Sequence, residues 1–186
     1  LIVTTLVSFS FAEKVIDFLS EPIGGIQALQ SIEVTENIGV FMRVSLMCGL
    51  VIALPIILYE ILAFIVPGLK PNERRWVFIG LGVGTIFFVM GIFFSFKIFL
   101  PTALQFLLSF MQVQTIPRFS GYVKFVTNLL FWSGVSFELP LIIFVLAKVH
   151  LVNAQMLLKQ WRYAVVIIAV FSAIITPTVD PVNMGL

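Results

Sequence analysis

Three long apolar segments constrain the fold of this chain more than any other feature of its sequence. They occupy about 39–66, 76–100 and 125–147, and about 20 helical residues are enough to cross a hydrocarbon core about 30 Å thick. The whole chain is 60% hydrophobic and 11% charged, whereas soluble domains are about 45–50% apolar and about 25% charged. A soluble interior is too small for this much apolar surface. We therefore predict an all-α polytopic membrane protein, with one transmembrane domain over residues 1–186.

Two shorter apolar segments complete the predicted topology. Residues 1–12 supply the back half of a first, truncated span, which continues as an amphipathic surface helix at about 13–20. The last span, at about 163–177, is short for a crossing and needs a thinned bilayer or burial among other helices. Because the chain begins inside an apolar run and stops just after a turn, we expect further residues at both ends.

The loops between these spans differ in their content of Lys and Arg. The loops at 67–75 and 148–162 carry three such bases each, whereas the connection at 13–38 carries one and that at 101–124 carries two. Loops rich in Lys and Arg stay on the cytoplasmic side of a membrane. We therefore predict that 67–75 and 148–162 are cytoplasmic, and that a sixth span would bring both native termini to that side.

Two acidic residues lie within the predicted spans. Glu138 is next to Pro140 in the middle of a span, and a carboxylate at that depth needs a partner, water or a cavity. It could carry a proton, contact a ligand or lock two helices together, and a carboxyl group hydrogen-bonded inside the bundle is the structural alternative. Glu60 lies nearer the predicted cytoplasmic end, where it joins Glu138 in an intramembrane polar site or extends toward the surface.

The sequence lacks the residue sets that covalent or metal catalysis requires. It has one His and one Cys, and its Asp residues are Asp17 and Asp180. These provide neither a catalytic triad nor a set of metal ligands, and no phosphate-binding loop is present. We predict that the protein is not an enzyme, needs no cofactor or metal and binds no nucleic acid. Transport, protein translocation and a membrane scaffold remain.

Four motifs occur in order along most of the chain. They are LYEILAFIVPGLKPNERR at 58–75, FSFKIFLPTALQFL at 94–107, SGVSFELP at 133–140 and ITPTVDPVN at 175–183. Their order and spacing resemble the TatC family, the receptor subunit of the twin-arginine (Sec-independent) protein translocase. The resemblance implies a cup-like fold of six helices, of which about five are present here.

The resemblance also assigns a role to the first predicted cytoplasmic loop. It implies that this loop binds the twin-arginine signal peptides of folded precursor proteins. Glu73 corresponds to the glutamate that receives the two arginines, Arg74 lies beside it, and Phe64 corresponds to an aromatic residue near the same pocket. A carboxylate binds a guanidinium group with two parallel hydrogen bonds, which gives this assignment a physical basis.

Further residues correspond to regions where the family contacts its partners. Pro22 lies in the first outer loop, which resembles a region used for assembly and transport. Thr176, Pro177, Asp180 and Asn183 match the outer end of the fifth helix, where single-span TatA- and TatB-type subunits are received. The resemblance implies export driven by the proton-motive force across a bacterial plasma membrane, with thylakoid or archaeal membranes as alternatives, and a homo-oligomer within the receptor complex.

A second class of function is also compatible with the residues. A proton-coupled secondary transporter would use Glu138 as its proton site, and such transporters contain repeated halves around a site near the membrane midplane. No internal repeat is visible in this sequence. A structural membrane scaffold is the third possibility.

Overall fold

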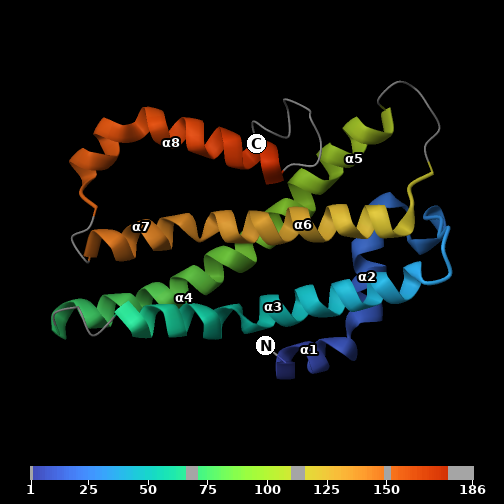
Figure 1. The fold of residues 1–186 in the computed structure, drawn as a ribbon, viewed down its shortest axis with the longest axis horizontal. Helices are drawn as coiled ribbons and strands as arrows, with labels where there is room; N and C mark the ends of the chain where they lie inside the picture. The colour runs from blue at the N-terminus through green and yellow to red at the C-terminus, as the bar shows by residue number, and fades with distance from the viewer. Residues whose placement is uncertain (1, 66–70, 110–115, 149–151, 176–186) are drawn as a thin grey trace.

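The computed structural model describes residues 2–65, 71–109, 116–148 and 152–175. Within these ranges the regular structure is helical and contains no β-strand. The all-α architecture predicted from the apolar segments is therefore confirmed. Figure 1 shows that the longest helices extend along the long axis of the molecule.

The central helix is α3 (Glu36–Ile65), whose 30 residues extend about 45 Å at 1.5 Å per residue. It continues through Pro55, since a membrane helix tolerates one missing backbone hydrogen bond. The short helix α1 (Ile2–Phe9) lies against α3. A β-carbon added at Gly49 of α3 would lie 2.7 Å from the α-carbon of Thr5. Only glycine permits this approach of the two backbones.

The helix α2 (Ala12–Ser20) coincides with the predicted amphipathic segment at 13–20. Its buried side chains include Ala12, Ile16 and Leu19, at the i, i+4 and i+7 spacing of a single helix face. This face joins the hydrophobic core, which α2, α3, α6 (Phe119–Phe137) and the segment 95–109 form together. The spacing of apolar residues among the charged ones gives α2 its one buried face.

After α3, residues 71–109 form three helical segments, and each begins at the residue after the one before it ends. They are α4 (Pro71–Phe94), the π-helix η4 (Ser95–Phe99) and α5 (Leu100–Ser109). The sequence predicted that this span ends near position 100, just before Pro101, but the helix continues to Ser109. We attribute the continuation to η4, because a wider π-helical turn makes room for a proline ring and tolerates its missing N–H.

The next span is divided into two helices at Glu138. It consists of α6 and α7 (Leu139–Lys148), which lie nearly end to end (Figure 1). Pro140 is the second residue of α7, a position at which a missing N–H removes no helical hydrogen bond. The proline thus lies in the first turn of a new helix, and Glu138 stands at the junction.

The last described helix, α8 (Ala154–Ile175), begins inside the segment 148–162 that the sequence predicted as a loop. Its first turns consist mainly of Gln, Met, Leu and Lys, which favour helix. The loop was predicted from the positions of Lys and Arg in this segment, without regard to the helix preference of the residues between them. Side chains from Gln155 to Val170 are all exposed, so α8 has little contact with the described bundle.

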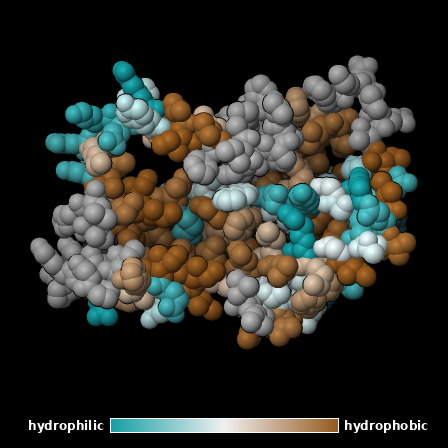
Figure 2. All heavy atoms as spheres, viewed as in Figure 1, coloured by the Kyte–Doolittle hydropathy of each residue, from teal (hydrophilic) through white to brown (hydrophobic). Residues whose placement is uncertain are grey.

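Helix α4 packs closely on α6. A β-carbon at Gly134 of α6 would lie 2.7 Å from the ring of Phe88, a fully buried side chain of α4. In the described ranges, three helical segments are long and apolar enough to cross a membrane, at Glu36–Phe64, Phe78–Leu108 and Phe119–Ala147. Figure 2 shows that hydrophobic atoms dominate the middle of the viewed face. These features are those of a multi-pass membrane protein.

Candidate functional site

The residues predicted to bind a signal peptide lie where α3 ends and α4 begins, at one end of the bundle (Figure 1). Phe64, in the last turn of α3, is 88% exposed. Glu60, one turn earlier on the same face, is also exposed. Arg74 is exposed in the first turn of α4. Glu73 belongs to that same turn, and its side chain lies outside the described part of the structure.

The described side chains at this end of the bundle include an exposed acid, Glu60, an exposed ring, Phe64, and an exposed base, Arg74. The rings of Tyr59 on α3 and Phe78 on α4 are 6.1 Å apart between centroids and hold the two helices together. The first turn of a helix carries unpaired N–H groups and the positive end of the helix dipole, which stabilise an acidic residue at the position of Glu73. The exposed ring of Phe64 supplies an apolar contact nearby.

The second predicted site residue, Glu138, is buried at the junction of α6 and α7. It is 4% exposed, and neither of its carboxylate oxygens has a hydrogen-bond partner among the described residues. Its Oε2 faces α4, where a β-carbon added at Gly84 would lie 2.8 Å away. No hydrogen bond joins it to Glu60 among the described residues, and a polar site shared by the two acids stays a prediction. An unpaired buried carboxyl group is costly, which marks Glu138 as a functional candidate.

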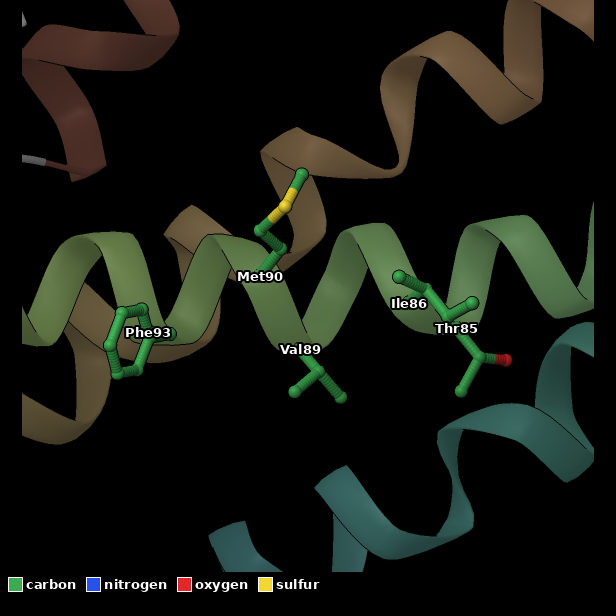
Figure 3. A pocket seen from close by; sticks show the side chains of 5 residues that line it. All are labelled: Thr85, Ile86, Val89, Met90 and Phe93. Atoms are coloured by element: carbon green, nitrogen blue, oxygen red, sulfur yellow. The ribbon is translucent and has the colours of Figure 1, made fainter.

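An apolar hollow of about 440 Å³ lies along the face of α4 that points away from Gly84. Thr85 supplies the polar atom of this lining, and its hydroxyl already donates to the carbonyl of Leu81 at 3.0 Å. The hollow therefore offers no set of converging polar groups for a small ligand. Figure 3 shows the five lining side chains, which are Thr85, Ile86, Val89, Met90 and Phe93.

The predicted partner contacts are described only in part. Pro22 is exposed in the short 3-10 helix η1 (Glu21–Ile23), in the connection between α2 and α3. The other predicted contact residues lie outside the described residues. These are Thr176, Pro177, Asp180 and Asn183.

A polar cluster that sequence reasoning missed joins the start of α3 to the start of α6. The carboxylate of Glu36 is 1% exposed and accepts hydrogen bonds from the Ser120 amide at 2.6 Å and from Arg118 Nε at 3.2 Å. Arg118 Nη2 also pairs with Glu33 at 2.8 Å. These hydrogen bonds, to Glu33 and then to Glu36, raise the pKa of the Arg118 guanidinium group. We call Glu33, Glu36, Arg118 and Ser120 the Glu36 clamp.

The backbone reinforces the Glu36 clamp. The amide of Gln30 donates to the carbonyl of Pro117 at 3.1 Å, and the amide of Phe119 donates to the carbonyl of Gln30 at 3.0 Å. The sequence shows the acids in the connection at 13–38 and the one Arg in the connection at 101–124. No spacing rule, however, indicates that residues more than 80 positions apart will pair.

Comparison with known proteins identifies the family of the chain. The family model described as Sec-independent protein translocase protein (TatC) matches residues 1–186. The chain belongs to the TatC family. The family that the four motifs predicted is therefore confirmed. Its members are components of a protein translocase.

Individual TatC proteins and structures support this assignment. The chain is 35% identical over 198 residues to TatC of Deinococcus radiodurans, a match that covers 100% of this chain and 72% of that protein. It is 36% identical over 183 residues to a chloroplastic TATC of Oryza sativa subsp. japonica, covering 96% of this chain and 50% of that protein. The chain thus spans about half the length of the chloroplast relatives that it matches.

The fold agrees with a crystal structure of the twin-arginine translocase receptor TatC in the detergent DDM. The two share 32% sequence identity with a TM-score of 0.86, over 100% of this chain and 84% of that one. A second crystal structure of the receptor matches with a TM-score of 0.84 and the same identity. The TatC-like fold predicted from the four motifs is confirmed, and the chain is a multi-pass membrane protein related to bacterial and chloroplast proteins.

Proposed function

We propose that this TatC family member is the receptor subunit of a twin-arginine translocase. It recognises the signal peptides of folded precursors and recruits TatA- and TatB-type subunits for export driven by the proton-motive force. The observation that carries this proposal is the structural match to a twin-arginine translocase receptor over 100% of the chain at 32% identity. Family membership also favours the receptor over a proton-coupled transporter.

The signal peptide binds, in this proposal, at the end of the bundle where α3 meets α4. Glu73 receives the guanidinium groups of the twin arginines, and Arg74 helps to orient the carboxylate. Phe64, 88% exposed, contacts the apolar part of the signal peptide. The support comes from the exposed ring of Phe64 and from the place of Glu73 in the first turn of α4, because arginine pairs with carboxylates in two parallel hydrogen bonds.

Partner subunits bind, in this proposal, along α8 and around the predicted contact residues that follow it. The exposed apolar side chains of α8 suit a single apolar helix lying in the membrane, and they include Val165, Val166, Ile167 and Ile168. The chain performs no covalent chemistry in this role. Copies of the receptor assemble into a homo-oligomer in the bacterial plasma membrane.

The test of signal-peptide recognition is Glu73→Ala. A charge-assisted hydrogen bond contributes about 1.5–3 kcal/mol, so loss of the carboxylate should weaken binding about 10- to 150-fold. Glu73→Gln should recover little of it, because an amide offers one acceptor and no charge. Binding is measured by photo-crosslinking a twin-arginine precursor and its twin-lysine variant to each receptor in membranes.

The matched control is Glu13→Ala, which removes an exposed acid from α2, away from the proposed site. It should leave crosslinking unchanged. The proposal predicts that Glu73→Ala loses the preference for arginine over lysine. If the preference is as strong in Glu73→Ala as in the parent, Glu73 does not bind the arginines.

A further inference from the structure

A second polar cluster joins α3 to α6, deeper in the bundle than the Glu36 clamp. Arg43 of α3 donates from Nη2 to Asn128 Oδ1 at 2.8 Å and from Nε to Thr127 Oγ1 at 3.2 Å, both on α6. We call Arg43, Lys124, Thr127 and Asn128 the Arg43 cluster. Figure 2 shows hydrophilic atoms on the viewed face between α3 and α6, with hydrophobic atoms on the side toward the middle of the molecule.

The positive charge of Arg43 is not balanced by a nearby acid in the described structure. Among the described residues, the ion pairs are those of Arg118 with Glu33 and Glu36. The two groups that Arg43 does contact, a hydroxyl and an amide, are neutral. Arg43 lies seven residues into α3, about 10 Å from the helix start. An unbalanced charge at this depth is costly, so an anion that reaches it gains binding energy.

Lys124 and Gly39 shape the space beside Arg43. Lys124 is exposed and lies four residues before Asn128, which places it on the same face of α6 and one turn nearer the helix start. Gly39 stands four residues before Arg43 on α3, and a β-carbon there would meet nothing within 4 Å. Helical side chains lean toward the helix N-terminus, so both cations extend toward open space at the Glu36 end of the bundle.

The surface changes character one turn further into the membrane. Leu46 follows Arg43 by three residues on α3, Trp132 follows Asn128 by four residues on α6, and both side chains are exposed. The faces that carry the cations therefore become apolar toward the membrane centre. A ligand that fits both parts has an anionic group at one end and a hydrocarbon chain below it.

We propose that the Arg43 cluster binds the phosphodiester of an anionic phospholipid, in the leaflet at the end where α3 and α6 begin. Arg43 provides a planar fork of donors for the phosphate, and Lys124 adds a point charge. Basic pockets between membrane helices bind lipid headgroups in this way. Thr127 and Asn128 hold the guanidinium group in position, while Leu46 and Trp132 contact the acyl chains. A choline headgroup fits less well, because its ammonium would lie near two cations.

Native mass spectrometry of the purified full chain in detergent tests this proposal. The protein is titrated with palmitoyl-oleoyl phosphatidylglycerol and, separately, with the corresponding phosphatidylcholine. The parent should bind one phosphatidylglycerol more tightly than phosphatidylcholine. Arg43→Gln should weaken phosphatidylglycerol binding at least about tenfold, since hydrogen bonds to the charged phosphate are lost. Lys124→Gln should weaken it about two- to fivefold, as expected for an exposed point charge.

A second test variant and one control separate lipid binding from folding and from net charge. Lys124→Gln changes an exposed side chain that makes no hydrogen bond or ion pair in the described ranges, so its effect does not depend on the contact between α3 and α6. Lys159→Gln removes the same charge from the first half of α8, where the side chain is exposed, and should leave the tightest lipid unaffected.

Equal affinity for the two lipids in the parent would overturn the proposal. So would unchanged phosphatidylglycerol binding in both Arg43→Gln and Lys124→Gln. Arg43 would then form an ion pair with an acidic side chain of a partner helix.

Discussion

The unpaired carboxyl group of Glu138 leads to a prediction in which stability and transport change in opposite directions. Glu138→Met replaces the buried acid by an unbranched apolar side chain of similar length. Leaving a buried polar group without a partner costs about 1–3 kcal/mol, whereas an apolar group of the same shape avoids that cost. For a chain of 186 residues, each 1 kcal/mol shifts the midpoint of thermal unfolding by about 2–4 °C.

We therefore expect the melting temperature of Glu138→Met in detergent to rise by roughly 2–12 °C. Glu138→Gln keeps a polar group without a partner and should change the melting temperature little. Both variants should insert into the membrane at the level of the parent. If Glu138 acts in transport, both should reduce export of a twin-arginine precursor per receptor molecule.

The assay is thermal unfolding followed by tryptophan fluorescence, combined with export measured in cells at matched receptor levels. Glu60→Met is the control, because Glu60 is exposed on α3 and its replacement should leave the melting temperature unchanged. A lower melting temperature and lower abundance in Glu138→Met, with normal export per molecule, would refute the reasoning. Glu138 would then be a structural lock between helices.

Two further predictions concern the clamp and the topology. Glu36→Gln should lower the melting temperature by several degrees, because the buried carboxylate accepts four hydrogen bonds and an amide must turn an NH₂ group toward some of those donors. Glu33→Gln should lower it less, since that side chain is 63% exposed; equal shifts would contradict the role of the buried acid. For topology, a single cysteine introduced by Asn72→Cys in a Cys48→Ala background should resist an impermeant thiol reagent outside intact cells, whereas Gln30→Cys should react. The reverse pattern would invert the orientation.

Much of the helical framework could be predicted from the sequence, because apolar length sets where helices cross a membrane. The described residues of the apolar segments at 39–66 and 125–147 belong to long helical segments, α3 and α6–α7. Helix ends were harder to predict, and prolines explain why. A proline interrupts a helix only where the structure cannot accommodate its ring and its missing N–H. Pro55 is accommodated inside α3 by the surrounding helical packing, and Pro101 by the π-helical turn before it.

The polar contacts between helices could not be predicted. The sequence shows that Glu138 and Arg43 lie in apolar segments, but local periodicity does not reveal what they face. Arg43 is paired with Thr127 and Asn128 through contacts more than 80 residues apart. Glu138 has no described partner at all. Such pairing depends on the rotation of each helix about its axis, which tertiary packing determines.

The Glu36 clamp has a mechanical consequence for the bundle. It ties the first residues of α3 to the residues just before and within the start of α6, so the separation of these two helices is fixed at that end. Any change in the angle between them must pivot about the clamp, and displacement grows with distance along α3. A tilt of about 5° over a helix of about 45 Å moves the far end by about 4 Å. The junction of α3 and α4, at that far end, is therefore where the bundle widens most for the least strain.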